Sequence, residues 1–362
     1  MIKSAYIHIP FCKKKCKYCS FVSFPSLKLK HDYIKALLEQ IKSEYKGEYL
    51  KTLYIGGGTP SLLELKDFKE IFAEFNILPD CEITVELNPE STTVELLAGL
   101  KMLGVNRLSI GAQSFNDKIL KLIGRAHNSN QIKSALNCAR AAGFKNVSID
   151  LIYGLPSQKI EDFLSSLETA INLNVEHISL YGLKIEEGCY FYKFPPINVA
   201  DLDLQADMFE AAVKFLKQND FIHYEVSNFC KKGCESKHNL NYWKNQFYYG
   251  FGCSASGYFD TNIRYTNQSD LNKYITSPLE KELEIELSQK EILEEEIFLG
   301  LRTLEGINFR EINEKFGIDF FEKYANILNK YKEYFQISGD KLAFSEEGIL
   351  ISNEILAEFI EL

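Results

Sequence analysis

The chain has 362 residues, of which 46% are hydrophobic and 25% charged, and its formal net charge is −9 at pH 7. This composition excludes a disordered protein, and the length predicts one large domain with a smaller appendage. The acidic balance disfavours nucleic acid and anionic membranes as partners. We recognise no secretory leader and no membrane-spanning apolar run, and nine cysteines fit metal chemistry in a reducing compartment better than a disulfide framework. A cytoplasmic protein is therefore predicted.

Three cysteines near the start of the chain, Cys12, Cys16 and Cys19, are candidate metal ligands. Their CxxxCxxC spacing suits the iron atoms of one cluster better than the paired CxxC knuckles of a zinc site. Three thiolates on a four-iron cluster leave one iron open to a small molecule. A zinc site completed by His8 or His31, or a disulfide, is the alternative and fits the motif less well.

Strand-like and helix-like segments alternate after a first strand at residues 4–9 and a helix over 27–45. Short β-branched runs predict strands at 52–55, 82–87, 107–110, 147–151 and 177–183. Amphipathic segments predict helices at 64–75, 93–103, 117–123, 130–142, 159–173 and 201–218. About six βα units imply a parallel sheet with helices outside. The pattern alone does not distinguish a doubly wound sheet from a partial barrel.

Polar residues and glycines gather late within these strands or just after them, where parallel α/β folds place their chemistry. The run Gly56-Gly-Gly-Thr-Pro60 can expose backbone N–H groups to a carboxylate, or it can be only a tight turn. Glu86 and Asp150 are carboxylates in apolar strands and need polar partners if buried, whereas a surface position is the alternative for Glu86. Gln113 and Arg125 are suited to holding a carboxylate or a nucleotide.

The segment 221–285 carries His238 in an HNxxYW motif that contains the only tryptophan of the chain. A histidine among flat aromatic rings suits a porphyrin, through an axial nitrogen and stacking. On residue types alone, a hydrogen-bonded core histidine is the commoner role. Cys230 and Cys234 precede it in a CxxxCxxxH string, which has the ligand types for a second metal but which we interpret as incidental.

The order of the predicted elements changes in residues 286–362. Helices are predicted over 288–305, 309–316 and 320–331, followed by a hairpin at 335–344 and a terminal helix, an order typical of a winged-helix-like unit. The acidic run 291–296 favours a protein or domain contact over nucleic acid. We therefore expect three parts, at 1–220, 221–285 and 286–362.

The stretch from Tyr6 to Cys19 resembles the cluster loop of the radical S-adenosylmethionine (SAM) superfamily, in the branch of oxygen-independent coproporphyrinogen III oxidase and heme chaperones of the HemW type. The resemblance implies a partial (β/α)6 barrel and a 4Fe–4S cluster on Cys12, Cys16 and Cys19, with SAM on the fourth iron. In the oxidase the matching positions are assigned to two SAM molecules. The first set is Tyr6, Gly57 and Glu86, and the second is Tyr18, Gly58, Thr59, Gln113, Arg125 and Asp150.

Two functions compete within this branch. The HNxxYW motif resembles one implicated in heme binding by the chaperones, which implies a heme contact at His238. Phe21 stands where the oxidase has a further cysteine, and the chain starts five residues before Tyr6, whereas the oxidase has a longer N-terminal extension. We therefore expect a heme chaperone that passes heme to an acceptor such as a respiratory enzyme, which allows transient contact with a membrane protein. The alternative is the oxidase reaction, the oxidative decarboxylation of coproporphyrinogen III.

Overall fold

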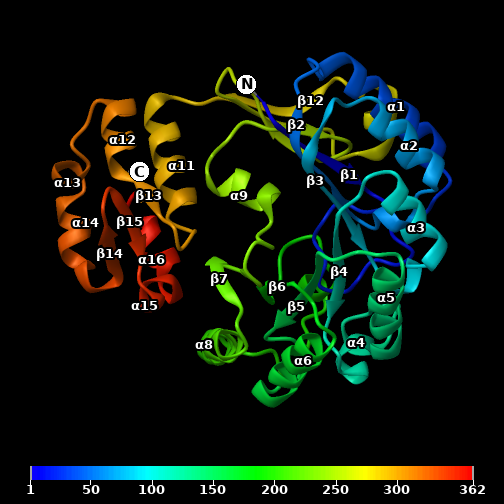
Figure 1. Cartoon of the computed structure of the whole chain (residues 1–362), viewed down its shortest axis with the longest axis horizontal. Coiled ribbons are helices and arrows are strands. Elements are labelled where there is room, and N and C mark those ends of the chain that lie inside the picture. The colour runs from blue at the N-terminus through cyan, green and yellow to red at the C-terminus, as the bar shows by residue number, and fades with distance from the viewer. Residues whose placement is uncertain (1, 361–362) are drawn as a thin grey trace.

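A nine-stranded sheet in the order β7-β8-β6-β5-β4-β3-β2-β1-β9 organises residues 2–360, the part of the chain that this computed structural model describes (Figure 1). Six central strands run parallel to one another and are rich in buried apolar residues, because both of their faces are covered. They are β1 (Ser4–Ile9), β2 (Leu50–Gly57), β3 (Ile77–Leu87), β4 (Arg107–Gln113), β5 (Val147–Tyr153) and β6 (His177–Gly182). The sheet does not close, so the predicted partial barrel is confirmed as an open one.

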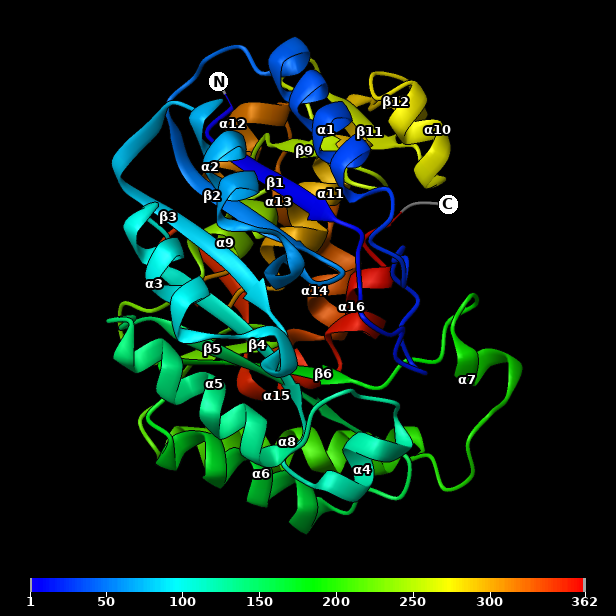
Figure 2. The same ribbon diagram turned by 90° about the vertical axis from the view of Figure 1, so that its right-hand side faces the viewer.

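Helices cover the outer face of this sheet (Figure 2). They are α1 (Lys30–Glu44), α2 (Leu65–Ala73), α3 (Val94–Met102), α4 (Asp117–Leu122), α5 (Ser129–Ala141), α6 (Ile160–Asn172) and α8 (Leu202–Gln218). Local sequence sets where they begin. The Thr93 hydroxyl accepts from Leu96 N, and Asn128 and Gln131 form a capping box at the start of α5. A short helix, α7 (Tyr190–Lys193), lies in the connection between β6 and α8.

The segment after α8 completes both edges of the main sheet. The strands β7 (Ile222–Glu225) and β8 (Asn228–Cys230) add antiparallel pairs beside β6, and β9 (Tyr249–Phe251) pairs parallel to β1. Between them lies α9 (Lys237–Trp243), which holds the HNxxYW motif. A small antiparallel sheet follows, formed by β10 (Ser256–Tyr258), β11 (Ile263–Asn267) and β12 (Lys281–Glu286), with α10 (Leu271–Thr276).

The C-terminal residues form a unit with its own apolar core, which includes Ile297, Phe320, Leu342 and Ile355. Its helices are α11 (Gln289–Gly300), α12 (Phe309–Phe316), α13 (Phe320–Lys323), α14 (Ala325–Lys330), α15 (Glu346–Leu350) and α16 (Ser352–Ala357). Its three strands, β13 (Ile307–Asn308), β14 (Phe335–Ser338) and β15 (Lys341–Phe344), form one antiparallel sheet. The winged-helix-like arrangement is confirmed, although the single helix expected over 320–331 is two short helices that meet at Tyr324.

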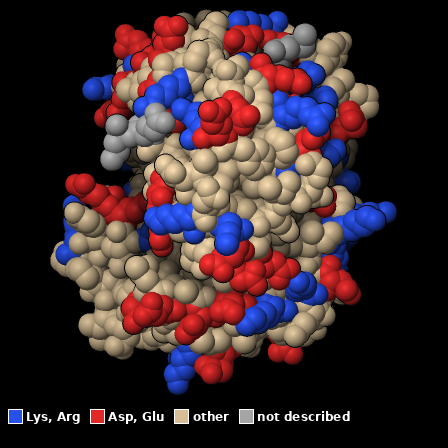
Figure 3. Space-filling model, turned by 90° about the vertical axis from the view of Figure 1, so that its left-hand side faces the viewer, with Lys and Arg blue, Asp and Glu red and all other residues tan. Residues whose placement is uncertain are grey.

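The side of the molecule that carries the C-terminal unit shows basic and acidic side chains intermingled around uncharged ones (Figure 3). Within residues 2–360, the structure contains no helix with the length and apolar character needed to cross a membrane.

Candidate functional site

A cavity of about 450 Å³ lies at the C-terminal ends of the parallel strands. The three N-terminal cysteines line it, although they are distant in sequence from most of its other walls. Of the SAM contacts expected from the sequence, those that line the cavity are Tyr18, Gly57, Gly58, Thr59, Glu86, Gln113, Arg125 and Asp150. The topology thus brings nearly all of the predicted residues together, because parallel strands end at one edge of the sheet.

Two of the three cysteine sulfurs accept hydrogen bonds from the cavity wall. The Thr59 hydroxyl donates to Cys12 Sγ and the Arg125 guanidinium donates to Cys16 Sγ, both at 3.5 Å. Burial raises the pKa of the Cys19 thiol to about 11. Thiols on one wall, with donors directed at their sulfurs, fit an iron–sulfur cluster, whose thiolates are tuned by such bonds.

A single-ion site is not preformed there. Within the part of the chain that the structure describes, no three His, Cys, Asp or Glu side chains are arranged to hold one metal ion. His8, considered above as a fourth zinc ligand, instead bonds through its ring nitrogens to the Tyr6 hydroxyl and Val22 O. All nine cysteines are free.

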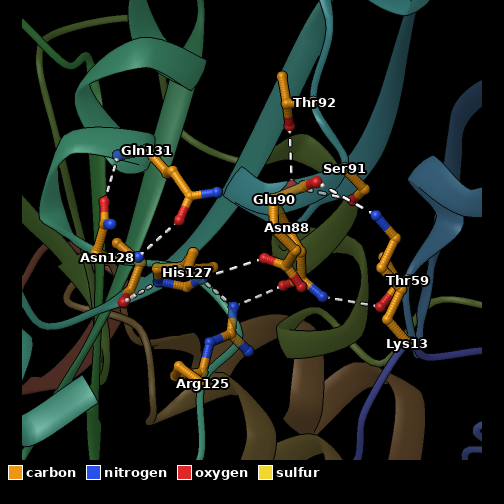
Figure 4. Close-up of polar contacts among 12 residues, drawn as sticks. Lys13, Thr59, Asn88, Glu90, Ser91, Thr92, Arg125, His127, Asn128 and Gln131 are labelled. Carbon is orange, nitrogen blue, oxygen red and sulfur yellow. Dashed lines mark hydrogen bonds and ion pairs between the residues drawn. The ribbon is translucent and has the colours of Figure 1, made fainter. Parts of the chain in front are cut away.

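Asn88, directly after β3, connects the two sulfur donors (Figure 4). Its side-chain nitrogen donates to Thr59 Oγ1 at 2.8 Å, and its oxygen accepts from Arg125 Nη2 at 2.6 Å. Its backbone oxygen in turn accepts from the hydroxyls of Ser91 and Thr92. Asn88 was not among the residues predicted from the sequence, although its position immediately after a strand, in the run from Glu86 to Glu90, was an available signal.

Glu86 is held at the end of β3 by two donors. Its carboxylate accepts from the Tyr54 hydroxyl at 2.8 Å and from Gly57 N at 3.0 Å. Burial raises its pKa to about 7, so the carboxyl group is partly protonated at neutral pH. Gly57 has φ +109, and a Cβ there would lie 2.6 Å from the His8 ring. The glycine run therefore allows the ends of β1 and β2 to approach closely.

Gln113 and Asp150 form the wall contributed by β4 and β5. Gln113 is a non-glycine residue with φ +68, at a bulge in the pairing of the two strands. Such strained backbone at a cavity wall is typical of functional positions. Asp150 accepts from the Ser109 hydroxyl at 3.1 Å, and burial raises its pKa.

His238 and Tyr6 lie behind the cavity wall, outside its lining. His238 is only 1% exposed, and burial lowers its pKa to about 3. Its Nδ1 bonds to the Thr52 hydroxyl and its Nε2 to the Tyr242 hydroxyl, both at 2.8 Å, while its ring stacks on Tyr54 at 5.0 Å. The heme contact at His238 stays a prediction, and an iron bond at Nε2 would replace the bond to Tyr242.

Comparisons with known proteins identify the class. The profile of the Radical SAM superfamily matches residues 6–170, and that of the HemN C-terminal domain matches residues 287–351. The fold is similar to the solved structure of coproporphyrinogen III oxidase (HemN) from Escherichia coli, with a TM-score of 0.87 at 22% identity over 99% of this chain and 90% of that chain. Fold and cysteine cavity together define a radical SAM protein with a HemN-type C-terminal domain.

Comparison with individual relatives identifies the family within this class. The chain is 37% identical to the heme chaperone HemW of Lactococcus lactis, over 99% of this chain and 97% of the relative. It is 36% identical to the heme chaperone HemW of Bacillus subtilis, over 99% of both chains. The chain belongs to the HemW family.

Proposed function

We propose that the protein is a heme chaperone of the HemW type, which binds a 4Fe–4S cluster, SAM and heme and transfers heme to an acceptor protein. The observation that carries this proposal is that three free cysteines and most of the residues expected to contact SAM line one and the same cavity. Membership of the HemW family supports the heme function. We also propose that the acceptor is a respiratory enzyme and that the protein acts in the cytoplasm.

The residues divide into distinct roles under this proposal. Cys12, Cys16 and Cys19 hold the cluster, which with SAM supplies one-electron chemistry when bound. Thr59 and Arg125 orient the sulfurs and neutralise part of their charge. The remaining lining residues, Tyr18, Gly57, Gly58, Glu86, Gln113 and Asp150, bind SAM, with Tyr6 supporting the wall from behind.

The test is an anaerobic assay of the reconstituted protein with SAM and a reductant. Heme is added to one set of samples and coproporphyrinogen III to the other. We expect stoichiometric heme binding, seen as a shift of the Soret band, without decarboxylated product. Transfer is then followed by mixing the heme-loaded protein with an apo-protein acceptor of the respiratory type. If decarboxylated product forms over many turnovers, the chaperone function would be rejected in favour of the oxidase reaction, whose enzyme shares this fold.

A further inference from the structure

The chaperone function requires a surface that heme can reach, and His238 is buried behind the cavity wall with both ring nitrogens bonded. We propose that heme docks at the mouth of the cysteine cavity, on the aromatic side chains of Phe21, Tyr190 and Phe194 with Lys14 and Lys15 beside them. We call these five residues the cavity-mouth surface. The inference rests on the proposed heme-binding function and adds the place where heme first binds.

The aromatic part of this surface is unusually exposed. Phe21 is 67% exposed and itself lines the cavity, and Tyr190 and Phe194 are 51% and 60% exposed. The rings of Tyr190 and Phe194 lie 4.9 Å apart, on and beside α7. Large aromatic side chains that stay exposed indicate a binding surface, and flat rings suit a flat macrocycle.

The loop that carries α7 is hydrogen-bonded to the segment that contains Cys12, Cys16 and Cys19, which we call the cysteine loop. Phe191 N donates to Lys17 O at 2.9 Å, and the Ser20 hydroxyl donates to the Glu186 carboxylate at 2.7 Å. The Lys17 ammonium lies 5.7 Å from the centre of the Tyr190 ring. Figure 2 shows α7 projecting beside the N-terminal loop. The exposed rings are therefore continuous with the segment that bears Cys12, Cys16 and Cys19.

The charge at the mouth also matches heme, which carries two propionates. Lys14, Lys15 and Lys184 line the cavity, although the whole chain has a net charge of −9. Four carboxylates line the same cavity, and each is hydrogen-bonded within the chain: Glu86, Glu90, Asp150 and Glu186. Glu187, next to Glu186, is exposed. Lysine ammonium groups beside an aromatic platform provide partners for propionates without requiring an axial iron ligand.

A second cavity, of about 500 Å³, fits heme less well. It lies between α9 and α11 and is lined by Tyr242 and Phe298 together with Glu291, Glu294 and Glu295. Its cation Arg264 is paired with Glu295 at 2.7 Å. Propionates would meet carboxylates there, so like charges disfavour heme in this place.

The experiment is a heme titration of the full-length, cluster-reconstituted protein, followed by the Soret band. One variant combines Tyr190→Ser with Phe194→Ser, and a second combines Lys14→Glu with Lys15→Glu. We expect each to weaken heme binding at least tenfold, and we expect the aromatic variant to keep SAM binding and iron content at the wild-type level. The matched controls lie where strands begin, at the opposite end of the sheet: Tyr49→Ser, which removes a 63% exposed ring, and Lys51→Glu with Lys145→Glu.

The outcomes separate this inference from the function on which it rests. A wild-type protein that binds no heme would overturn the chaperone proposal itself. If the wild type binds heme and both mouth variants bind it with an affinity within twofold of the wild type, only the docking site would be overturned. If the lysine variant alters iron content, the aromatic variant decides the question, because its two residues lie outside the cysteine loop.

Discussion

Cys16 occupies the middle of the cysteine loop, and its sulfur accepts from the Arg125 guanidinium. Replacing it by alanine removes one of the three proposed iron ligands and leaves the cluster held by two. We expect Cys16→Ala to lose the brown chromophore and most of the bound iron after anaerobic reconstitution with iron and sulfide. Cys138→Ala, on α5 and outside the cavity lining, is the matched control and should reconstitute fully. A full cluster in Cys16→Ala would exclude this residue as a ligand.

His238 makes a structural contribution that does not depend on any ligand. Its two ring hydrogen bonds and its stacking on Tyr54 are all made in the interior. We expect His238→Ala to lower the free energy of unfolding by about 2–4 kcal/mol, because it leaves the Thr52 and Tyr242 hydroxyls without these partners and opens a cavity. Urea unfolding measures this loss. His31→Ala, at an exposed position on α1, should cost less than about 0.5 kcal/mol, and equal losses in the two variants would contradict the prediction.

Single residues of the site were predictable to different degrees. The cysteines and the glycine run could be found because their spacing is local and unusual. Asn88 and Tyr54 were missed, because an asparagine or a tyrosine gains its role mainly from neighbours that the fold brings close, such as Thr59 and Arg125 around Asn88. For His238 the residue types favoured a hydrogen-bonded core histidine, and the side chain is buried and hydrogen-bonded in the structure. Its partners could not be predicted, because they depend on α9 packing against β2.

At the scale of elements, Glu82 of β3 anchors the helix that carries the HNxxYW motif. Its carboxylate accepts from Lys237 N at 3.1 Å and from His238 N at 3.0 Å, two amides at the start of α9. The first amides of a helix have no partner within the helix, and a carboxylate also opposes the positive end of the helix dipole. Residue 82 was predicted to lie in a strand, but this bond to a segment more than 150 residues away was not predicted.

Glu82→Ala leaves these two amides without their acceptor. We expect a loss of about 2–3 kcal/mol in unfolding free energy, together with faster hydrogen exchange at the amides of α9 than at those of the parallel strands. Exchange followed by mass spectrometry gives the local readout, and Glu168→Ala, at an exposed position on α6, is the control. Unchanged exchange in α9 would show that Ser236, whose side chain accepts from Asn239 N, holds the helix start alone.

The elements that could be predicted are those with strong apolar patterns. The six parallel strands and the helices between them are long enough that their buried faces appear in the sequence as a regular repeat of apolar residues. In contrast, β8, β9 and β10 have three residues each, too few to show a period, and their places depend on pairing partners. The break at Tyr324 was missed because both halves of the predicted helix keep an apolar face on the C-terminal core.

At the scale of the whole molecule, the HNxxYW helix reaches from the cavity wall to the C-terminal unit. His238 packs on Tyr54 behind the cavity, whereas the ring of Trp243, five residues on, lies 5.9 Å from the Arg302 guanidinium. Backbone bonds join the same places, from Val226 N to Arg302 O at 2.9 Å and from Leu304 N to Tyr224 O at 3.1 Å. The edge of the main sheet and the C-terminal unit therefore meet around α9.

Glu225 is fully buried at this junction, and its charge makes the stability of the protein depend on pH. Burial raises its pKa from 4.5 to about 7, against the opposing bond from Ser227 N and the positive charge of Arg302. Because the folded-state pKa is the higher one, the folded protein binds the proton more tightly. The stability that this proton contributes is fully present below about pH 4.5 and is lost as pH rises through 7, a change of about 3 kcal/mol.

Glu225→Gln keeps the shape of the side chain and removes its titration. We expect the variant to gain stability relative to the wild type as pH rises from 5 to 8, measured by urea unfolding at each pH. Glu86, whose pKa is also about 7, titrates in both proteins, so their difference isolates residue 225. Glu168→Gln, at an exposed position, should follow the wild-type curve. Parallel curves for Glu225→Gln and wild type would contradict the prediction, because they would show that the proton occupancy of residue 225 does not change over this pH range.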